Sequence, residues 1–301
     1  MRIVVAGGTG FLGAALVRRL RAEGHLVSVL TRTPHASGQL AWNPANTSGP
    51  WVMAVEAADA VINLAGEPIA AARWTRRRKA ALHDSRLNTT RALVTAMTQG
   101  ARTPAVLLNA SAIGIYGPHG DEPLTEDSPT GTDFLALLGI EWEDEAATAA
   151  RYTRVVMLRT GIALDYGGGA LQQMAMPFYF MAGGPLASGE QYVSWIHRDD
   201  WTGMVSWALA NASVSGPLNV TAPNPVTNQE FAQTLGRVLR RPSFVRTPEF
   251  ALRAVLGEMA TMITTGQRVL PAKALALGYH FQYPTLEETL RAIYARRSMV
   301  Q

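Results

Sequence analysis

Cysteine is absent from this 301-residue sequence, and lysine is nearly absent. Without cysteine the chain can form no disulfide, no thiolate metal site and no cysteine nucleophile. Of the 27 basic residues, only Lys79 and Lys273 are lysines, and the others are arginines. Any motif that needs a lysine must therefore use one of these two positions.

Long apolar runs are also missing. No stretch offers about 18 uninterrupted apolar residues, so we expect no membrane span. The first residues are typical of a strand and show no charged leader followed by an apolar segment, so we expect no secretory signal and a cytoplasmic protein. The spacing of histidine, aspartate and glutamate predicts no metal site, and no Gly-x-Ser-x-Gly motif occurs.

Charge gives little support for a nucleic-acid partner. The formal net charge is +4, and 17% of the residues are charged. The densest basic run, Arg73 to Lys79, contains a single aromatic residue, Trp74. We interpret this run as the solvated face of a helix in preference to an RNA or DNA footprint. The expected partner is a small-molecule substrate, with a homodimer as a further possibility.

Short apolar runs alternate with helical patterns through the first half of the chain, which predicts a parallel sheet with crossover helices. We therefore expect a Rossmann-type, doubly wound α/β fold. One helix should start near Leu12 and end at Gly24. Strands are predicted over 3–6, 26–30, 60–65, 105–110, 153–158 and 218–221, and further helices over roughly 86–99 and 134–150.

The pattern changes after about Leu164, where glycine and proline clusters separate shorter elements. This change predicts a smaller C-terminal α+β lobe for the substrate, interwoven with the first domain. The Rossmann domain would take residues 1–163 and 196–222. The lobe would take residues 164–195 and 223–301.

The stretch VVAGGTGFLG places four glycines where the first strand turns into a helix. It fits both Gly8-x-Gly10-x-x-Gly13 and Gly7-x-x-Gly10-x-x-Gly13. In this context the glycines let the diphosphate of a dinucleotide approach the N–H groups and the positive dipole end of the helix.

The residue after the second strand indicates which dinucleotide is bound. An NAD site usually has an acidic residue about 20 positions after the glycine motif, where it holds the ribose 2′-hydroxyl. Here Arg32 takes that place. Because an arginine can pair with a 2′-phosphate, we predict NADP(H) as the cofactor.

Further motifs follow in order: NLAG (63–66), SRLNTT (85–90), SAIGIYG (111–117) and GGPLASGEQYVSWIHRDD (183–200). With the glycine loop, they resemble the extended short-chain dehydrogenase/reductase superfamily, and more closely its atypical SDR39U1-like epimerase branch. The resemblance runs essentially end to end. It implies an epimerase-like or oxidoreductase activity on a nucleotide sugar or a small carbonyl compound.

The glycine loop and this resemblance together imply a set of cofactor contacts. Asn88 would correspond to a helix asparagine that orders water and backbone near the active site. Arg86 would reach a phosphate or a substrate, or it would cross-link helices. The expected cofactor contacts are Gly7, Thr9, Gly10, Phe11, Leu12, Arg32, Leu64, Ala65, Gly66, Asn88 and Ala110.

The catalytic Tyr-x-x-x-Lys pair of the superfamily is absent. A lysine at 79 would need a tyrosine where Thr75 stands, and a lysine at 273 would need one where Val269 stands. By position, the helix that should carry the pair has Leu138 and Trp142 instead. Tyrosine-driven hydride chemistry of the usual kind is therefore in doubt.

Three other residues are candidates for proton transfer, each with a structural alternative. Ser111 would lie near the nicotinamide or would be a strand-end hydroxyl, since it is one residue away from the superfamily's usual serine position. Tyr116 would lie at the ligand-binding edge of the sheet or would be a packed aromatic. Glu67 would face the nicotinamide or a substrate hydroxyl, or would be a solvated loop acid.

Substrate contacts are expected from the second lobe. Gln191 and Tyr192 follow a flexible stretch and could turn toward the substrate. His197 would either meet the substrate or brace the interface between the lobes. The function predicted is an NADP(H)-binding epimerase or oxidoreductase, and the alternative is a non-catalytic NADP(H) sensor.

Overall fold

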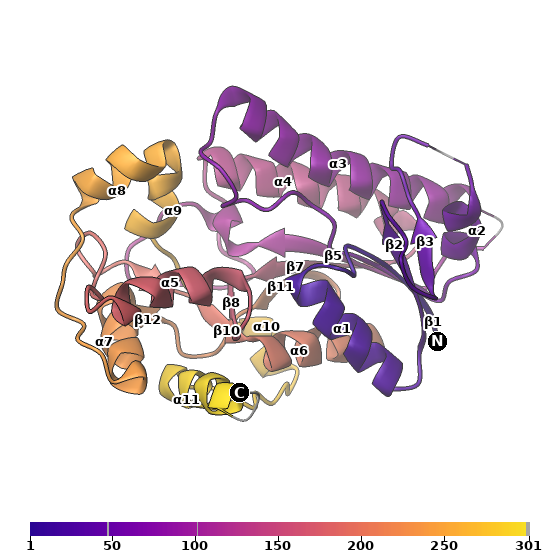
Figure 1. The fold of residues 1–301 in the computed structure, drawn as a ribbon. Helices are drawn as coiled ribbons and strands as arrows, with labels where there is room; N and C mark the ends of the chain where they lie inside the picture. Colours follow the sequence, from indigo (N-terminus) through magenta and orange to yellow (C-terminus); the bar gives the residue numbers. More distant parts are fainter. Residues whose placement is uncertain (47, 101, 299–301) are drawn as a thin grey trace.

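A single parallel sheet forms the centre of the molecule (Figure 1). The computed structural model describes residues 1–46, 48–100 and 102–298. The strands of the sheet are β1 (Arg2–Ala6), β2 (Leu26–Thr31), β3 (Gln39–Ala41), β4 (Ala60–Asn63), β5 (Val106–Ala112), β7 (Arg154–Thr160) and β11 (Gly216–Val220). They are ordered β11-β7-β5-β4-β1-β2-β3, and every neighbouring pair is parallel.

The strand order reverses between β1 and β4, where successive strands are added on opposite sides. This is the topological switch point of a doubly wound sheet, and ligands of such folds bind outside the carboxyl ends of the strands there. The predicted Rossmann-type α/β fold is thus confirmed.

Both faces of the sheet are covered by helices, which is why its strands are continuous apolar runs. α1 (Phe11–Ala22) and α6 (Arg198–Ala210) pack on one face through one apolar cluster. The other face, visible at the top of Figure 1, is covered by α2 (Pro50–Glu56), α3 (Arg76–Gln99) and α4 (Phe134–Ala147).

The smaller lobe has its own apolar cluster. Helices α5 (Gly169–Tyr179), α7 (Asn228–Leu239) and α11 (Leu286–Ser298) contribute to it. The C-terminal part also contains α8 (Glu249–Leu256), α9 (Thr261–Thr264) and α10 (Ala272–Ala276), and α10 packs into the apolar cluster of the sheet through Ala274. Three short strand pairs accompany them: β8 (Ile162–Leu164) with β10 (Trp195–His197), β9 (Tyr192–Val193) with β12 (Val226–Thr227), and β6 (Pro123–Leu124) with β13 (Arg268–Val269). Segment 196–222 returns to the central sheet, where β11 forms its edge strand and α6 packs on one face. The chain therefore passes between the sheet domain and the smaller lobe more than once.

α3 is longer than predicted and begins at Arg76 instead of near Arg86. Thr75 caps it, since its hydroxyl accepts the N–H of Arg78 at 3.1 Å. In the first part of α3, before Leu87, only Leu82 is buried. The apolar periodicity that predicts a helix is therefore weak in this part. β3 and α2 were not predicted, because each is short.

The basic run at the start of α3 is not wholly solvated, which corrects that part of the sequence interpretation. Arg73 donates to the carbonyl oxygens of Val255 and Ala254 at 2.7 and 2.6 Å, at the end of α8. Lys79 pairs with Glu258 at 2.5 Å. These contacts tie the loop before α3 to the smaller lobe.

None of the helices in the described part of the chain has both the length and the apolarity that crossing a bilayer requires.

Candidate functional site

The turn between β1 and α1 is so tight that two of its positions, Gly7 and Gly13, have no room for a Cβ atom. Gly7 has φ +76°, and a Cβ there would lie 2.6 Å from the carbonyl of Leu64. A Cβ on Gly13 would lie 2.2 Å from the carbonyl oxygen of Gly7. The first turn of α1 is therefore held directly against the ends of β1 and β4.

This turn leaves the N-terminus of α1 available to an anion. Gly10 is the N-cap residue and provides no side-chain cap, and the first turn contains no acidic residue. The first N–H groups of a helix have no partner within the helix, and together with the helix dipole they attract negative charge. The donor set thus fits the diphosphate of a dinucleotide.

The predicted cofactor residues gather around this turn. Ala6 pairs in register with Leu30 of β2 and Asn63 of β4, and Asn63 pairs with Asn109 of β5. β1, β2 and β4 therefore end at nearly the same level, and β5 continues for three residues beyond Asn109. Residues just after the ends of β1, β2 and β4 are Gly7, Thr9, Gly10, Phe11, Leu12, Arg32, Leu64, Ala65 and Gly66, and Ala110 lies within β5 next to Asn109.

Arg32 is exposed and follows β2 directly, at the same edge of the sheet. That position agrees with contact to a 2′-phosphate. The role stays a prediction.

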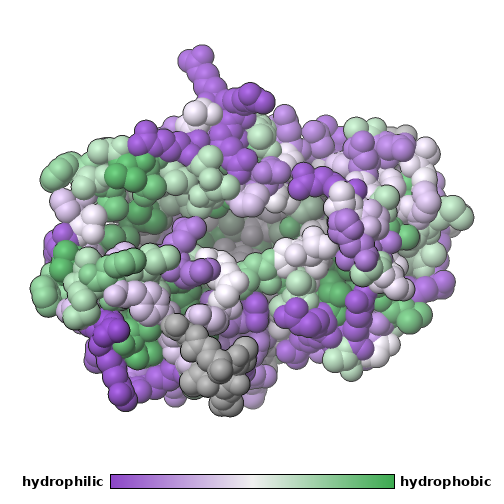
Figure 2. Space-filling model, viewed as in Figure 1, coloured by the Kyte–Doolittle hydropathy of each residue, from purple (hydrophilic) through white to green (hydrophobic). Residues whose placement is uncertain are grey.

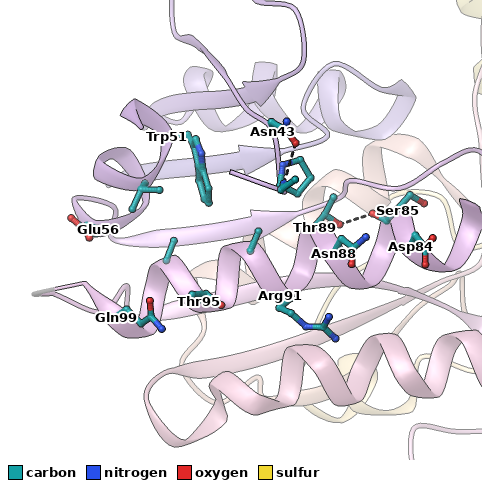
Figure 3. A pocket seen from close by; sticks show the side chains of 15 residues that line it. Asn43, Trp51, Glu56, Asp84, Ser85, Asn88, Thr89, Arg91, Thr95 and Gln99 are labelled. Carbon is teal, nitrogen blue, oxygen red and sulfur yellow. Dashed lines mark hydrogen bonds between the residues drawn. The ribbon is translucent and has the colours of Figure 1, made fainter. Parts of the chain in front are cut away.

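Asn88 lines a groove between α2 and α3 (Figure 3), and its contact with the cofactor stays a prediction. The groove encloses about 810 Å³ and opens beside Asn43, which follows β3. Trp51 forms part of its wall and packs on Trp42, with ring centroids 5.9 Å apart. Sequence reasoning did not find this groove, because α2 and β3 were themselves missed.

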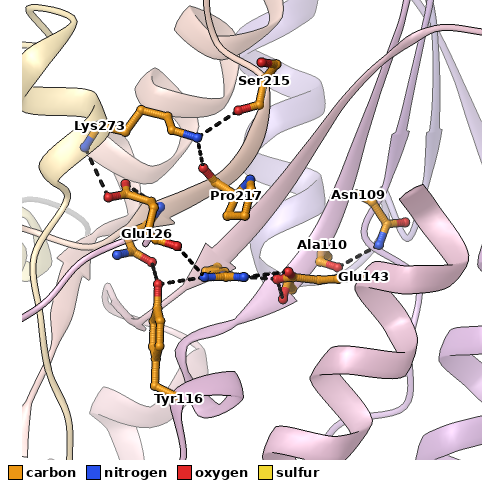
Figure 4. A network of polar contacts seen from close by, with 11 residues as sticks. Asn109, Ala110, Tyr116, Glu126, Glu143, Ser215, Pro217 and Lys273 are labelled. Carbon is orange, nitrogen blue, oxygen red and sulfur yellow. Dashed lines mark hydrogen bonds and ion pairs between the residues drawn. The ribbon is translucent and has the colours of Figure 1, made fainter. Parts of the chain in front are cut away.

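A buried ion pair joins α4 to β7 (Figure 4). The guanidinium of Arg159 donates to both carboxylate oxygens of Glu143, at 2.9 and 2.8 Å. The two residues are only 5% and 7% exposed. The hydroxyl of Ser111 also donates to Glu143, at 2.6 Å. A two-pronged arginine–carboxylate pair of this kind positions both elements firmly.

Tyr116 extends the same network from the short 3₁₀ turn Ile113–Tyr116. Its hydroxyl donates to Asn219 Oδ1 at 2.7 Å and accepts from Arg159 Nη1 at 3.0 Å. Burial raises the pKa of this phenol, so it stays protonated at neutral pH. The structure thus brings Ser111 and Tyr116 into one network and engages both hydroxyls, while their catalytic roles stay predictions.

The two positions of the missing Tyr-x-x-x-Lys pair lie on α4. Leu138 and Trp142 are buried, and the indole N–H of Trp142 donates to Thr90 Oγ1 at 2.9 Å. Lys273 lies in the network of Figure 4, where its ammonium donates to the carbonyl of Ser215 at 2.8 Å. Burial lowers the pKa of Lys273.

Glu67 lies in the loop between β4 and α3. Its carboxylate accepts from Arg78 at 3.2 Å, and its backbone N–H donates to the hydroxyl of Ser85 at 3.1 Å. The side chain is about a third exposed, at 37%. Glu67 is therefore ion-paired, in contrast to the solvated loop acid considered as its alternative.

The predicted substrate residues lie in the smaller lobe. The amide of Gln191 donates to the carbonyl oxygens of Leu186 and Ile263, at 3.0 and 2.8 Å. The ring of Tyr192 faces the guanidinium of Arg268 at 5.3 Å. Both side chains thus hold segments of this lobe together, and substrate contact stays a prediction.

His197 is fully buried at the N-terminus of α6. Its Nδ1 accepts the backbone N–H of Asp199 at 2.9 Å, and its ring stacks on Tyr283 with centroids 3.9 Å apart. Burial lowers its pKa to about 4. These contacts favour the bracing role over the substrate role.

Sequence reasoning did not find Glu143 and Arg159. The available signal was a charged residue directly after an apolar strand, at Arg159, together with an acid on the helix before it. That signal does not indicate which acid among Glu141, Glu143 and Glu145 turns inward. Among the described residues, no cluster of three metal-ligating side chains occurs.

Comparison with known proteins agrees with this arrangement. The model of the NAD dependent epimerase/dehydratase family matches residues 3–160. The chain belongs to this family. A second model, a domain of unknown function (DUF1731), matches residues 247–293, which include α8 to α10 and part of α11.

Relatives within the epimerase family cover the chain almost completely. The epimerase family protein SDR39U1 of Mus musculus is 40% identical over 98% of this chain and 100% of its own length. The crystal structure of human SDR39U1 with NADPH superposes with a TM-score of 0.90, at 38% identity over 98% of this chain and 99% of the other. A nucleoside-diphosphate sugar epimerase from Corynebacterium glutamicum has a TM-score of 0.80 at 30% identity, over 99% of this chain and 60% of its own.

The buried ion pair generates the first prediction. Glu143→Gln should lower the free energy of unfolding by about 3–5 kcal/mol, because it leaves the Arg159 cation buried without its carboxylate. Urea denaturation followed by circular dichroism measures this change. The matched control on the same helix is Glu145→Gln, whose partner Arg91 is 59% exposed, and it should cost less than about 1 kcal/mol. Equal losses in the two variants would contradict the prediction.

The second prediction concerns acid stability. His197 remains neutral in the folded chain down to about pH 4, whereas the unfolded chain binds a proton near the ordinary pKa of 6.5. Its contribution to stability is therefore complete above pH 6.5 and falls as the pH drops toward 4, by about 3 kcal/mol. His197→Asn should remove this part of the pH dependence in urea titrations. His280→Asn, at an exposed histidine, is the control. If His197→Asn leaves the slope of unfolding free energy against pH unchanged, His197 is not the source of this pH dependence.

Proposed function

We propose that this protein is a cytoplasmic NADP(H)-dependent enzyme of the epimerase and oxidoreductase type. Its substrate would be a nucleotide sugar or another small carbonyl compound. The observation that carries the proposal is the uncapped N-terminus of α1 behind the turn from Gly7 to Gly13. The human relative crystallised with NADPH supports the same cofactor.

When bound, NADP(H) supplies a nicotinamide that gives or accepts a hydride. The chain's own part is to orient it and to manage a proton. Ser111 Oγ donates to Glu143 Oε1 at 2.6 Å, so the ion-paired carboxylate fixes the orientation of this hydroxyl. Tyr116 has Arg159 and Asn219 as hydrogen-bond partners. In this proposal Ser111, Tyr116 or a bound water takes the place of the missing tyrosine.

A second candidate function is an NADP(H) sensor without turnover. The observation that favours it is that both candidate hydroxyls are buried and already engaged, Ser111 by Glu143 and Tyr116 by Asn219. Such a protein would bind the cofactor and pass on its oxidation state through the smaller lobe.

Turnover separates the two functions. Purified protein is mixed with NADPH and a panel of nucleotide sugars, aldehydes and quinones, and the absorbance of the reduced cofactor is followed. The enzyme is supported by oxidation that depends on a panel compound and is lost in Ser111→Ala or Tyr116→Phe. An epimerase causes no net oxidation of the cofactor, so the nucleotide sugars are also analysed for epimerisation by proton NMR. Tight NADPH binding with neither oxidation of the cofactor nor epimerisation of any panel member supports the sensor.

Gly10→Asp is the control for the site. Gly10 has φ −75° and ψ 176°, and a Cβ there would meet only the Gly7 carbonyl oxygen, at 3.5 Å. Aspartate is also a favoured N-cap, so the fold should keep its melting temperature. Its carboxylate would occupy the N–H groups and repel a diphosphate, so NADPH binding and turnover should both be lost. Turnover that survives in a folded Gly10→Asp variant would place the reaction elsewhere.

Arg32 supplies a test of cofactor choice. Arg32→Asp should weaken NADPH binding about 10- to 100-fold or more, because a charge-assisted hydrogen bond to the 2′-phosphate is replaced by repulsion. NADH, which lacks that phosphate, should be affected much less. Calorimetric titration with both cofactors measures the difference. Equal losses for NADPH and NADH would remove the 2′-phosphate role.

A further inference from the structure

Arg86 lies at the carboxyl end of β4, beside the predicted cofactor loop. A Cβ on Gly66 would be 3.4 Å from the central carbon of the Arg86 guanidinium. The guanidinium also lies over the ring of Trp142 on α4, 5.0 Å from its centroid. Arg86 thus bridges α3 and α4 where the chain leaves the sheet, and one face of its guanidinium is covered by an aromatic ring.

The molecule is hollowed near its centre. Figure 2, in the view of Figure 1, shows a depression between the α3 and α4 side and the α1 and α5 side. The carboxyl edge of a doubly wound sheet is the place where such folds bind their ligands.

Among the described residues, Arg86 has no carboxylate of its own. Its guanidinium donates to two backbone carbonyl oxygens, those of Leu82 at 2.9 Å and of Glu67 at 3.2 Å. The carboxylate of Glu67 is taken by Arg78, at 3.2 Å. A guanidinium has five N–H groups. Two of them donate to these carbonyl oxygens, and the other three remain available as donors.

Burial, with a smaller contribution from the nearby Arg78 cation, lowers the pKa of Arg86 to about 10, and the Glu67 carboxylate acts in the opposite direction without contacting the guanidinium. Arg86 therefore remains charged at neutral pH. A largely buried cation without an anionic partner is unfavourable until an anion pairs with it. A guanidinium is suited to bind such an anion, because two of its N–H groups match the two oxygens of a carboxylate or phosphate.

We propose that Arg86 binds an oxyanion, a carboxylate or a phosphate group, and that this group belongs to the substrate. The inference rests on the proposed function and narrows its substrate class to anionic compounds. The cofactor's own anions already have other partners in that proposal: the N-terminus of α1 for the diphosphate and Arg32 for the 2′-phosphate. Arg86 is a further cation that neither of them uses.

The test measures anion binding and needs no turnover. Inorganic pyrophosphate, oxalate and UDP are titrated by calorimetry into the full-length protein, with and without saturating NADPH. At least one probe should bind to the wild-type protein, and Arg86→Gln should weaken that binding about tenfold or more. The affinity for NADPH should change less than about threefold, since the cofactor makes its charged contacts elsewhere.

Two further variants serve as controls for the charge and for the shape of the Arg86 side chain. Arg77→Gln removes the same charge from an exposed position on the same helix, so it controls for the overall field and should leave probe binding unchanged. Arg86→Lys keeps the charge and loses the fork, so it should weaken binding less than Arg86→Gln does. It also keeps the test possible if loss of the two carbonyl contacts prevents Arg86→Gln from folding.

The proposal is overturned if no probe binds the wild-type protein, or if Arg77→Gln and Arg86→Gln weaken binding equally. It is also overturned if Arg86→Gln weakens NADPH binding about tenfold and leaves the probes unchanged, because the oxyanion then belongs to the cofactor. Failure of the proposed function has a different signature. In that case no panel compound is reduced or epimerised, while probe binding still depends on Arg86.

Discussion

The contact between Gly13 and the carbonyl oxygen of Gly7 sets the geometry of the whole site. It brings the first turn of α1 so close to the end of β1 that a Cβ at position 13 would overlap that oxygen, at 2.2 Å. Gly7 in turn lies against the backbone of Leu64 and Ala65. Three elements thus meet through backbone alone, at the point where the strand order reverses. The uncapped N–H groups of α1 face this point because no side chain intervenes.

A second constraint is the charge buried between α4 and β7. The helix that would carry Tyr-x-x-x-Lys has apolar side chains at both positions, Leu138 and Trp142, and its inward charge is Glu143. Arg159 neutralises that carboxylate and also donates to Tyr116. The result is a polar network inside the protein that includes both candidate hydroxyls. A fully satisfied buried network of this kind holds its hydroxyl groups in fixed orientations.

The smaller lobe is joined to the sheet by buried polar contacts in addition to the chain itself. Asp200 of α6 accepts the N–H groups of Gln282 and Tyr283, at 2.8 and 2.9 Å. His197 stacks on the same Tyr283. These contacts fix the segment that leads into α11 against the N-terminus of α6.

The sequence alone determined the features that depend on neighbours along the chain. The glycine spacing and the apolar strands predicted the sheet and the cofactor turn, and the placing of Arg32 after β2 predicted the choice of cofactor. The family was indicated by the resemblance that the glycine loop, NLAG, SRLNTT and SAIGIYG carry. Contacts between distant segments were decided by the tertiary structure. Tyr116 and Asn219 are 103 residues apart, and no local spacing shows that they share a hydrogen bond. Likewise, only the folded chain shows that Glu143 turns inward, that Asn88 faces a groove, and that no carboxylate among the described residues pairs with Arg86. Burial and charge compensation arise from packing, which a periodicity of two or 3.6 residues does not encode.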